Sequence, residues 1–387
     1  MTENKKKYRE SLVHITKRDA MVWWKAWLVR AVAIVFALFV CAGVVYALTG
    51  YNPFKVYAAM FEGTFGTPRK IWNTVQSTAM LLCISLAVTP AFKMRFWNIG
   101  AEGQVLMGGL ASAACMFYVG DRLPSAVLLL IMFAASVLAG IIWAIIPAYF
   151  KAKWNTNETL FTLMMNYVAT QLVSFAIMVW VPSGSSVMGV INRTSKSGWF
   201  PEIFGQKYLL NVIIVVAITV LMYIYLKYSK HGYEIAVVGE SENTARYIGI
   251  NVKKVILRTM AISGALCGVA GLLLVAGTDH TITKNTAGGM GFTAIMVSWL
   301  AKFNPIIMML TSFLIVFLQR GSGQIATSLR LNESISDILT GIILFFIIGC
   351  EFFVNYKVNF RRSHKFMVGC EFLLKFKINF HRSHKNK

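Results

Sequence analysis

Polar and charged side chains gather between two long apolar runs in the first third of the chain. Lys93 and Arg95 close the first run, and Asn98, Glu102 and Gln104 follow at the start of the second. A charge or amide at the end of a membrane span is costly to desolvate unless it lines a cavity or contacts a partner. The segment therefore predicts a functional site at the inner mouth of a helix bundle. Two roles stay open for Glu102, which can pair with Arg95 across a turn or line a solute pathway.

A second polar segment begins another apolar run. Glu158 lies at its start and Asn166 two helical turns further in. Glu158 either stabilises the first turn of this helix by pairing with Lys151 or Lys153, or lines the pathway. Asn166 either hydrogen-bonds between helices or contacts a solute. A third candidate is the glycine-rich segment around Gly289, which opens a half-length helix whose N-terminal amides can face a polar solute or a neighbouring loop.

The long polar loop at residues 228–258 carries helix signals of its own. Ser241 can cap a short helix that ends near Tyr247, and Arg246 near its end matches the helix dipole. Gly249 fits the stop after that helix, and the following residues can start another. The segment predicts a helix–turn–helix elbow between two spans. The alternative is an ordinary solvated loop.

The elements that must position these residues are membrane spans. The chain has 387 residues, of which 57% are hydrophobic and 14% are charged. Soluble domains average about 25% charged residues. We predict an all-α, polytopic membrane protein. Its ten spans are expected at about 27–48, 71–92, 99–119, 125–149, 160–181, 208–227, 259–277, 288–301, 304–318 and 335–353. The eighth and ninth are short, and a re-entrant hairpin is the alternative there.

The net charge of +22 is distributed as in a membrane protein rather than a nucleic-acid-binding one. Most Lys and Arg residues fall at the two ends and in alternate loops, so the positive-inside rule places both termini in the cytoplasm.

The expected domain organisation has three parts. They are a basic extension at 1–26, a transmembrane domain at 27–357 and a basic tail at 358–387. The tail repeats the segment 349–365 twenty residues later, either without function or as a second membrane-surface segment.

Nothing in the sequence indicates a catalytic, metal or cofactor site. The six cysteines are scattered and are expected as buried thiols. No phosphate-binding GxxxxGK[ST] motif occurs, so this chain does not bind nucleotide through a P-loop. Uphill transport would need energy from a partner or an ion. We expect no cofactor and no enzymatic activity in this chain.

Three separated segments resemble one family. "FWNIGAEGQ" differs by one aromatic residue from the "FNIGAEGQ" typical of permease subunits of ATP-driven importers in the simple-sugar and nucleoside branch. The segment from Asn157 to Tyr167 is similar to "NExxxTxxxNY", and the loop at 232–250 to "GYEIxxVGExxxxARYxGI". The resemblance covers about residues 27–357. The motif "RFWNIGAEGQ" and the N-terminal extension favour the nucleoside branch over the ribose-type sugar branch.

The resemblance implies a type II-like ABC importer permease fold in a bacterial plasma membrane. It implies a second permease subunit as partner, two ATPase domains below and an extracytoplasmic binding lipoprotein above. Pathway or gate positions would be Asn98, Glu102, Gln104, Glu158, Asn166 and Gly289. ATPase coupling positions would be Gly239, Glu240, Ala245, Arg246 and Gly249.

Two other classes remain as alternatives. An ion-coupled secondary transporter of a small polar solute would need ionisable groups deep in the spans and usually has inverted repeats. The carboxylates of Glu102 and Glu158 instead lie near span ends. A channel or membrane scaffold would have no energy coupling. An ATPase gene and a lipoprotein gene beside this one would discriminate between the three classes.

Overall fold

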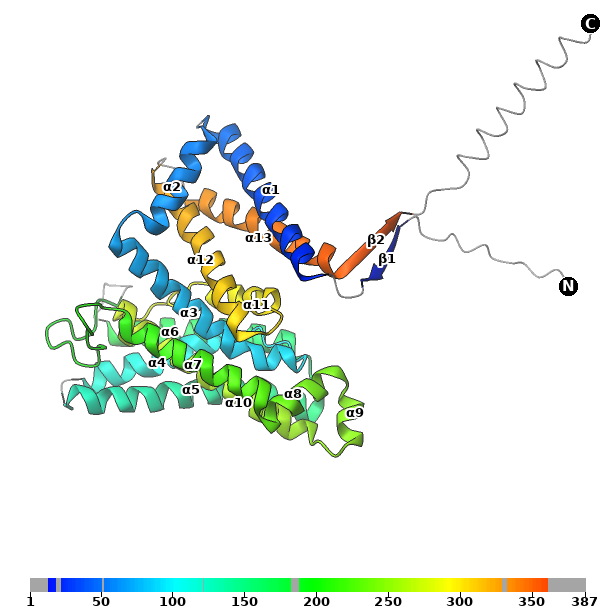
Figure 1. The fold of residues 1–387 in the computed structure, drawn as a ribbon. Helices are drawn as coiled ribbons and strands as arrows, with labels where there is room; N and C mark the ends of the chain where they lie inside the picture. The colour runs from blue at the N-terminus through cyan, green and yellow to red at the C-terminus, as the bar shows by residue number, and fades with distance from the viewer. Residues whose placement is uncertain are drawn as a thin grey trace, which may run out of the picture. The chain divides into compact units, whose positions relative to one another are not determined.

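A computed structural model describes residues 13–18, 22–50, 52–120, 122–181, 188–328 and 333–360 (Figure 1). The chain divides into two compact units, one formed by residues 51–340 and the other by 1–50 together with 341–387. In chain order, the elements are β1 (Val13–Lys17), α1 (Trp23–Thr49), α2 (Pro53–Phe65), α3 (Pro68–Lys93), α4 (Ala101–Val119), α5 (Ser125–Trp154), α6 (Glu158–Trp180), α7 (Leu209–Tyr228), α8 (Lys230–Glu240), α9 (Glu242–Tyr247), α10 (Val252–Leu274), the π-helical turn η1 (Val275–Asp279), α11 (Met290–Leu300), α12 (Pro305–Ser328), α13 (Glu333–Asn355) and β2 (Tyr356–Phe360).

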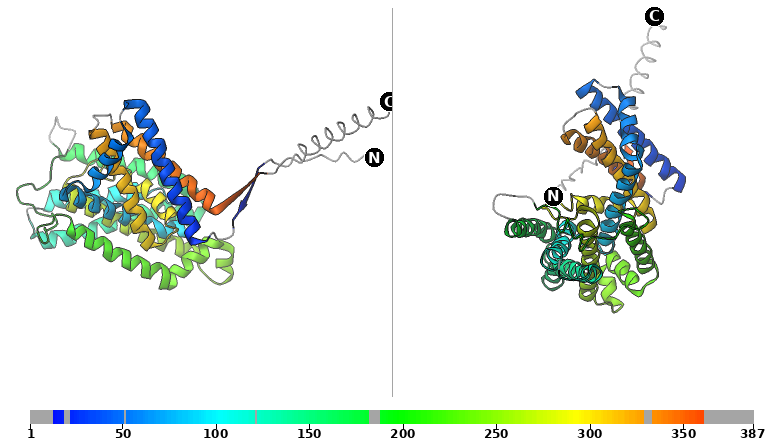
Figure 2. Two further views of the ribbon diagram at one scale, coloured as in Figure 1. Left: turned by 45° about the horizontal axis from the view of Figure 1, so that its top comes forward. Right: turned by 90° about the vertical axis from the view of Figure 1, so that its left-hand side faces the viewer.

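The centre of the larger unit is a tight packing of α10 against α3, α4 and α5 (Figures 1 and 2). Glycines allow this approach. A Cβ atom added to Gly108 would lie 2.5 Å from the Cα of Gly268, and one added to Gly264 would lie 2.3 Å from the carbonyl oxygen of Gly140. Helices in membranes associate through such close backbone contacts, because lipid provides no hydrophobic drive between them. The glycines therefore allow the backbones of α4, α5 and α10 to pack in direct contact at the centre of this unit.

Each of the ten predicted spans overlaps an observed helix in chain order, but α4, α11 and α13 are not among the helices that meet the length and hydropathy expected of a span. Within the described part of the chain, seven helices are long and apolar enough to cross a membrane. The ninth expected span is longer than predicted, because α12 continues through Gln319 and Arg320 to Ser328. Only α11 is short. Between the first two spans, α2 packs on α12.

The smaller unit contains a feature that the sequence analysis did not predict. Strands β1 and β2 pair antiparallel, with Val13 opposite Phe360 and Lys17 opposite Tyr356. They extend the two helices of this unit, α1 and α13, whose rings Phe36 and Phe346 meet edge to face at 5.3 Å. Main-chain pairing thus joins the segment before α1 to the segment after α13. Residues 361–387, including the repeated copy, lie outside the described residues.

Candidate translocation gate and coupling surface

The carboxylate of Glu102 binds the N-terminus of the short helix α11. Its Oε1 accepts a hydrogen bond of 2.8 Å from the amide of Gly289, and its Oε2 accepts one of 2.8 Å from the amide of Gly291. First-turn amides have no intrahelical acceptor, and the helix dipole favours a negative charge there. Glu102 therefore meets α11 rather than Arg95, and the glycine-rich segment meets a neighbouring helix.

Glycines make this contact possible. Gly289 has a φ of 73°, in the left-handed region that residues with a side chain rarely adopt. A Cβ atom on Gly291 would lie 2.5 Å from the backbone nitrogen of Glu102. The start of α11 can thus approach the start of α4 only because these positions lack side chains.

Asn98 and Gln104 form a reciprocal amide pair under the start of α4. The Gln104 Nε2 donates to the Asn98 Oδ1 at 3.2 Å, and the Asn98 Nδ2 donates to the Gln104 Oε1 at 3.4 Å. The Asn98 Nδ2 also donates to the Oγ of Ser263 on α10 at 3.3 Å. Both amide side chains are buried, so the pair ties the segment before α4 to α10.

Asn166 ties α6 to the same place. Its Nδ2 donates to the carbonyl oxygen of Ile99 at 2.9 Å, and its Oδ1 accepts from the amide of Gly103 at 2.9 Å. Thr162, one turn earlier on α6, accepts from the amide of Ile99 at 3.2 Å. Of the two roles considered for Asn166, the structure therefore displays the hydrogen bond between helices.

Glu158 lies apart from this group. Its carboxylate is 2.9 Å from the Nζ of Lys151, and both side chains are mostly buried. The cap of α6 is Asn157, which accepts from the amide of Leu160. Thus the structure brings Asn98, Glu102, Gln104, Asn166 and Gly289 together around the start of α4. Glu158 instead stabilises the first turn of α6.

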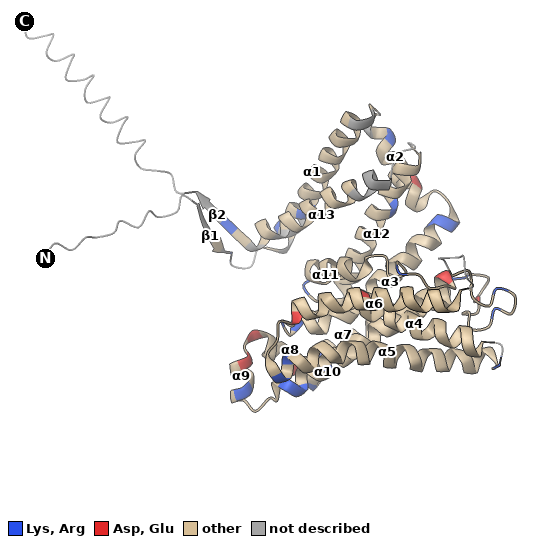
Figure 3. Ribbon diagram, turned by 180° about the vertical axis from the view of Figure 1, so that it is seen from behind, with Lys and Arg blue, Asp and Glu red and all other residues tan. Residues whose placement is uncertain are grey.

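The expected elbow is present as two short helices, α8 and α9. Ser241 caps α9 by accepting from the amide of Thr244. Gly249, with a φ of 84°, ends the helix, and the following amide of Ile250 donates back to Ala245, which is the Schellman pattern. Figure 3 displays the charged side of this elbow beside the start of α10.

The five predicted coupling positions divide into two sets. Gly239 and Ala245 are buried, and a Cβ atom on Gly239 would lie 2.1 Å from the carbonyl oxygen of Lys93 at the end of α3. Glu240, Arg246 and Gly249 are exposed. The buried set fastens the elbow to the bundle, and the exposed set is available to a partner.

Sequence reasoning missed two exposed hydrophobic residues at the end of α9. The Tyr247 side chain is 91% exposed and the neighbouring Ile248 is 54% exposed. Arg246 forms an exposed ion pair of 3.4 Å with Glu242 one turn earlier. An aromatic and an aliphatic side chain at a helix end, outside the apolar spans, were the available signal.

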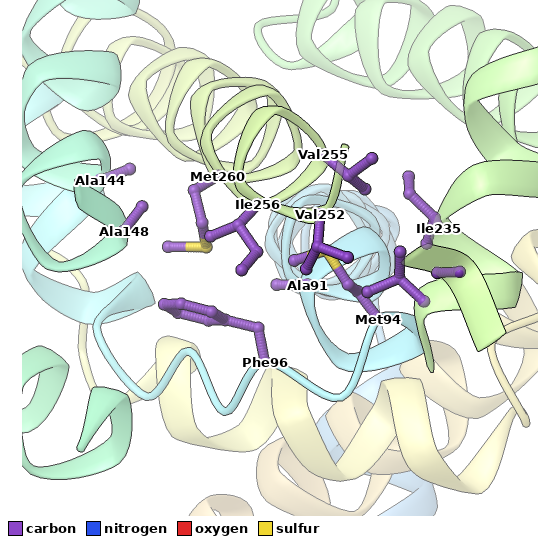
Figure 4. Close-up of a cluster of buried hydrophobic side chains, with 12 residues drawn as sticks. Ala91, Met94, Phe96, Ala144, Ala148, Ile235, Val252, Val255, Ile256 and Met260 are labelled. Carbon is purple, nitrogen blue, oxygen red and sulfur yellow. The ribbon is translucent and has the colours of Figure 1, made fainter. Parts of the chain in front are cut away.

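A buried cluster connects the elbow to the polar group around α4 (Figure 4). It contains Ile235 and Val238 of α8, Ala245 of α9, and Val252 and other residues of α10. Two further members lie in the turn between α3 and α4, and these are Met94 and Phe96. Asn98 follows that turn directly, so the cluster is continuous along the chain with the segment that carries the amide pair.

Arg95 sets the direction of this turn. Its φ is 61°, and the next amide, that of Phe96, donates to the carbonyl oxygen of Ala91. A left-handed residue followed by such a bond ends a helix in a Schellman motif. The consequence is that Phe96 enters the buried cluster while Trp97, 46% exposed, stacks on Trp299 at 5.7 Å.

Residues 71–348 match the family described as the permease component of branched-chain amino acid transport systems. The chain belongs to this family. It is 28% identical to a glucose ABC transporter permease protein of Haloferax volcanii, over 86% of this chain and 90% of that one. It is 28% identical to a guanosine ABC transporter permease protein of Bacillus subtilis, over 83% and 92%. It is 26% identical to a nucleoside ABC transporter permease protein of Lactococcus lactis subsp. cremoris, over 83% and 90%.

Family membership makes this chain a multi-pass membrane permease, a transport subunit. Among the residues that the structure describes, no group of three or more His, Cys, Asp and Glu side chains is placed to hold a metal ion. The predicted gate and coupling roles of individual residues go further than family membership.

This permease also has a cavity of about 720 Å³ at the end of α10 away from the elbow. Basic residues line it, together with the stacked pair Trp199 and His280, whose ring centroids are 3.8 Å apart. The basic lining residues are Arg193, Lys196 and Lys207. Burial, together with the positive charge of Lys207, holds the pKa of His280 below its ordinary value. The loops forming this cavity had no recognised motif.

Proposed function

We propose that the chain is the membrane-spanning permease subunit of an ATP-binding-cassette importer for a nucleoside or a related simple sugar. It would act with a second permease, two ATPase domains and an extracytoplasmic binding lipoprotein. The observation that supports this most directly is the elbow of α8 and α9. An exposed knob of Arg246, Tyr247 and Ile248 stands on helices that pack inward against the turn before α4.

Energy transfer follows from this packing. An ATPase that binds Arg246, Tyr247 and Ile248 would move α8 and α9. Gly239 would transmit this movement to α3, because its backbone lies against the carbonyl group of Lys93. The cluster around Phe96 carries the same displacement to the residues before α4. Protein interiors are close-packed and deform little, so such a contact acts as a stiff connection.

The gate is proposed at the start of α4. There Asn98, Gln104 and Asn166 join α4 to α6 and α10, and Glu102 joins it to α11. Opening a passage between these helices requires that some of these bonds exchange partners. These polar side chains can also bind the solute, because its hydroxyl and amide groups can replace a hydrogen-bond partner that a side chain loses when the gate opens.

The substrate class rests on the relatives. Two of the three named proteins carry guanosine or nucleoside in their names, and the third carries glucose. A nucleoside or sugar is polar and uncharged, which suits a bundle whose buried polar residues are mainly amides and hydroxyls. Orientation with both termini in the cytoplasm is part of the proposal and places the elbow on the ATPase side.

The test is ATP-driven uptake of a radiolabelled nucleoside into proteoliposomes that contain the complete complex. Arg246→Glu is expected to abolish uptake and nucleoside-stimulated ATP hydrolysis while membrane insertion stays normal, because it reverses the charge on the exposed knob. Lys253→Glu is the matched control. It makes the same change of charge at an exposed position in the first turn of α10, and it should retain most of the uptake.

Ion-coupled transport would be the competing result. Uptake by this permease in vesicles that lack any ATPase, driven by a sodium or proton gradient, would overturn the proposal. Equal uptake by the Arg246→Glu and Lys253→Glu complexes would remove the assigned role of the knob.

A further inference from the structure

Strand β2 is one of two nearly identical segments of this chain. Residues 356–360 read Tyr-Lys-Val-Asn-Phe, and residues 376–380 read Phe-Lys-Ile-Asn-Phe. The two differences, Tyr to Phe and Val to Ile, keep an aromatic and a β-branched residue in place. Both segments therefore have the same alternation of apolar and polar residues, which is the pattern of a strand with one apolar face.

The partner of β2 is the N-terminal strand β1. The register places Val13, Ile15 and Lys17 opposite positions 360, 358 and 356. Successive positions of a strand alternate between its faces, so these six positions share one face. Residues 380, 378 and 376 would occupy the same three places if the second segment paired with β1 in the same register. No apolar position would change face, which is the condition that specifies register.

We propose that residues 376–380 are a second, alternative partner strand for β1. They take the place of residues 356–360 when the first segment is withdrawn or damaged. The docking site is the edge of β1 that β2 now occupies, and the occupant is this segment of the same chain.

The length of the chain between the two segments allows the exchange and also determines which segment pairs with β1 more often. When the second segment pairs, the twenty residues 356–375 connect the end of α13 to the paired strand. An extended chain of that length spans roughly 60 Å, so reach is no obstacle. Closing a flexible loop of that size costs a factor of about 90 in the equilibrium constant, from the three-halves power of its length. Residues 356–360 therefore pair with β1 in most molecules, and residues 376–380 pair with it only in a small fraction.

Disulfide cross-linking in the full-length chain tests this. Thr16 lies opposite Lys357 in the register, and its counterpart in the second segment is Lys377. Thr16→Cys is combined with either Lys357→Cys or Lys377→Cys in membranes, with Cys370→Ser throughout to remove the tail thiol. Initial rates of cross-linking are compared. We expect the pair with Lys377→Cys to react at about one-hundredth of the rate of the pair with Lys357→Cys.

The decisive variant disables the first segment. Prolines at both 358 and 359 remove the ladder donor, whichever of the two neighbouring amides points toward β1. In that background, cross-linking between positions 16 and 377 should rise at least tenfold. Adding prolines at 378 and 379 should return it to the baseline set by Thr16→Cys with Asn386→Cys, which measures random collision within the same tail.

Two results would overturn the proposal. One is no rise between positions 16 and 377 when the first segment carries prolines. The other is cross-linking between positions 16 and 357 no faster than the Asn386→Cys baseline, because β1 would then have no paired strand to exchange.

Discussion

Replacing Glu102 by Gln should destabilise the permease by about 2–5 kcal/mol. Two backbone amides of α11 donate to this carboxylate at 2.8 Å each. A hydrogen bond to a charged group contributes about 1.5–3 kcal/mol. Gln keeps one carbonyl oxygen but turns its NH₂ group toward the second amide, so one bond is lost. Loss of the charge at the helix terminus adds about 0.3–2 kcal/mol.

The assay is unfolding in mixed micelles, followed by the reactivity of a buried thiol. Cys83 is fully buried on α3, the helix against which α11 packs. Its labelling by a maleimide dye reports the opening of this region. The free energy of unfolding is compared with that of Glu158→Gln, which also removes a first-turn carboxylate but breaks a single ion pair with Lys151. The glutamine amide oxygen can still accept a hydrogen bond from Lys151, so that control should cost about 1 kcal/mol, the difference between a hydrogen bond to a charged and to a neutral acceptor.

The reasoning fails if Glu102→Gln unfolds within about 0.5 kcal/mol of the unmodified protein. It also fails if the two glutamine variants lose equal stability, because the result would then reflect a generic loss of charge. In the assembled importer, Glu102→Gln should lower uptake more than insertion. Normal uptake in both Glu102→Gln and Asn98→Ala would show that the gate has been placed wrongly.

Three further outcomes are expected. Gly239→Ala should uncouple ATP hydrolysis from uptake without blocking insertion, because its Cβ would collide with the Lys93 carbonyl oxygen; equal coupling ratios would contradict this. The pKa of His280 lies below its ordinary value of about 6.5, so the unfolded state binds more protons than the folded state. The free energy of unfolding should therefore fall as the pH drops below about 6.5. His280→Gln should flatten that pH profile, and an unchanged profile would show that this histidine does not cause it. Deletion of residues 366–387 should leave assembly and uptake near normal, since β2 is retained; failure to recruit the ATPase would give the tail a role.

The sequence predicted the elements best where local signals act alone. Ser241 and Gly249 specify the start and stop of α9 through capping chemistry that needs no distant partner. The length of α12 was underestimated because Gln319 and Arg320 interrupt its apolar run. Arg320 donates to the Oγ of Ser77 on α3 at 2.6 Å, so a tertiary contact accommodates a charge that hydropathy alone counts as the end of a span.

The sequence singled out residues that lie together around the start of α4, but it did not predict how they pair. Glu102 and Gly289 were both singled out, but 187 positions separate them. Only the packing of α11 against α3 and α4 brings the carboxylate to the helix terminus. The pairing of β1 with β2 joins positions even further apart, and the aromatic stack of Trp199 on His280 has no sequence motif.

The filled N-terminus of α11 also bears on which solutes this permease can accept. Each amide from Gly288 to Gly291 already donates a hydrogen bond, two of them to Glu102 and the others to Asn285 and Ala287. A helix terminus of this kind otherwise attracts phosphate and carboxylate groups. A phosphorylated solute arriving here would meet a resident carboxylate in place of open amides and would be repelled. The bundle thus supplies its own anion to this terminus, and at the proposed gate this arrangement would favour solutes without an anionic group.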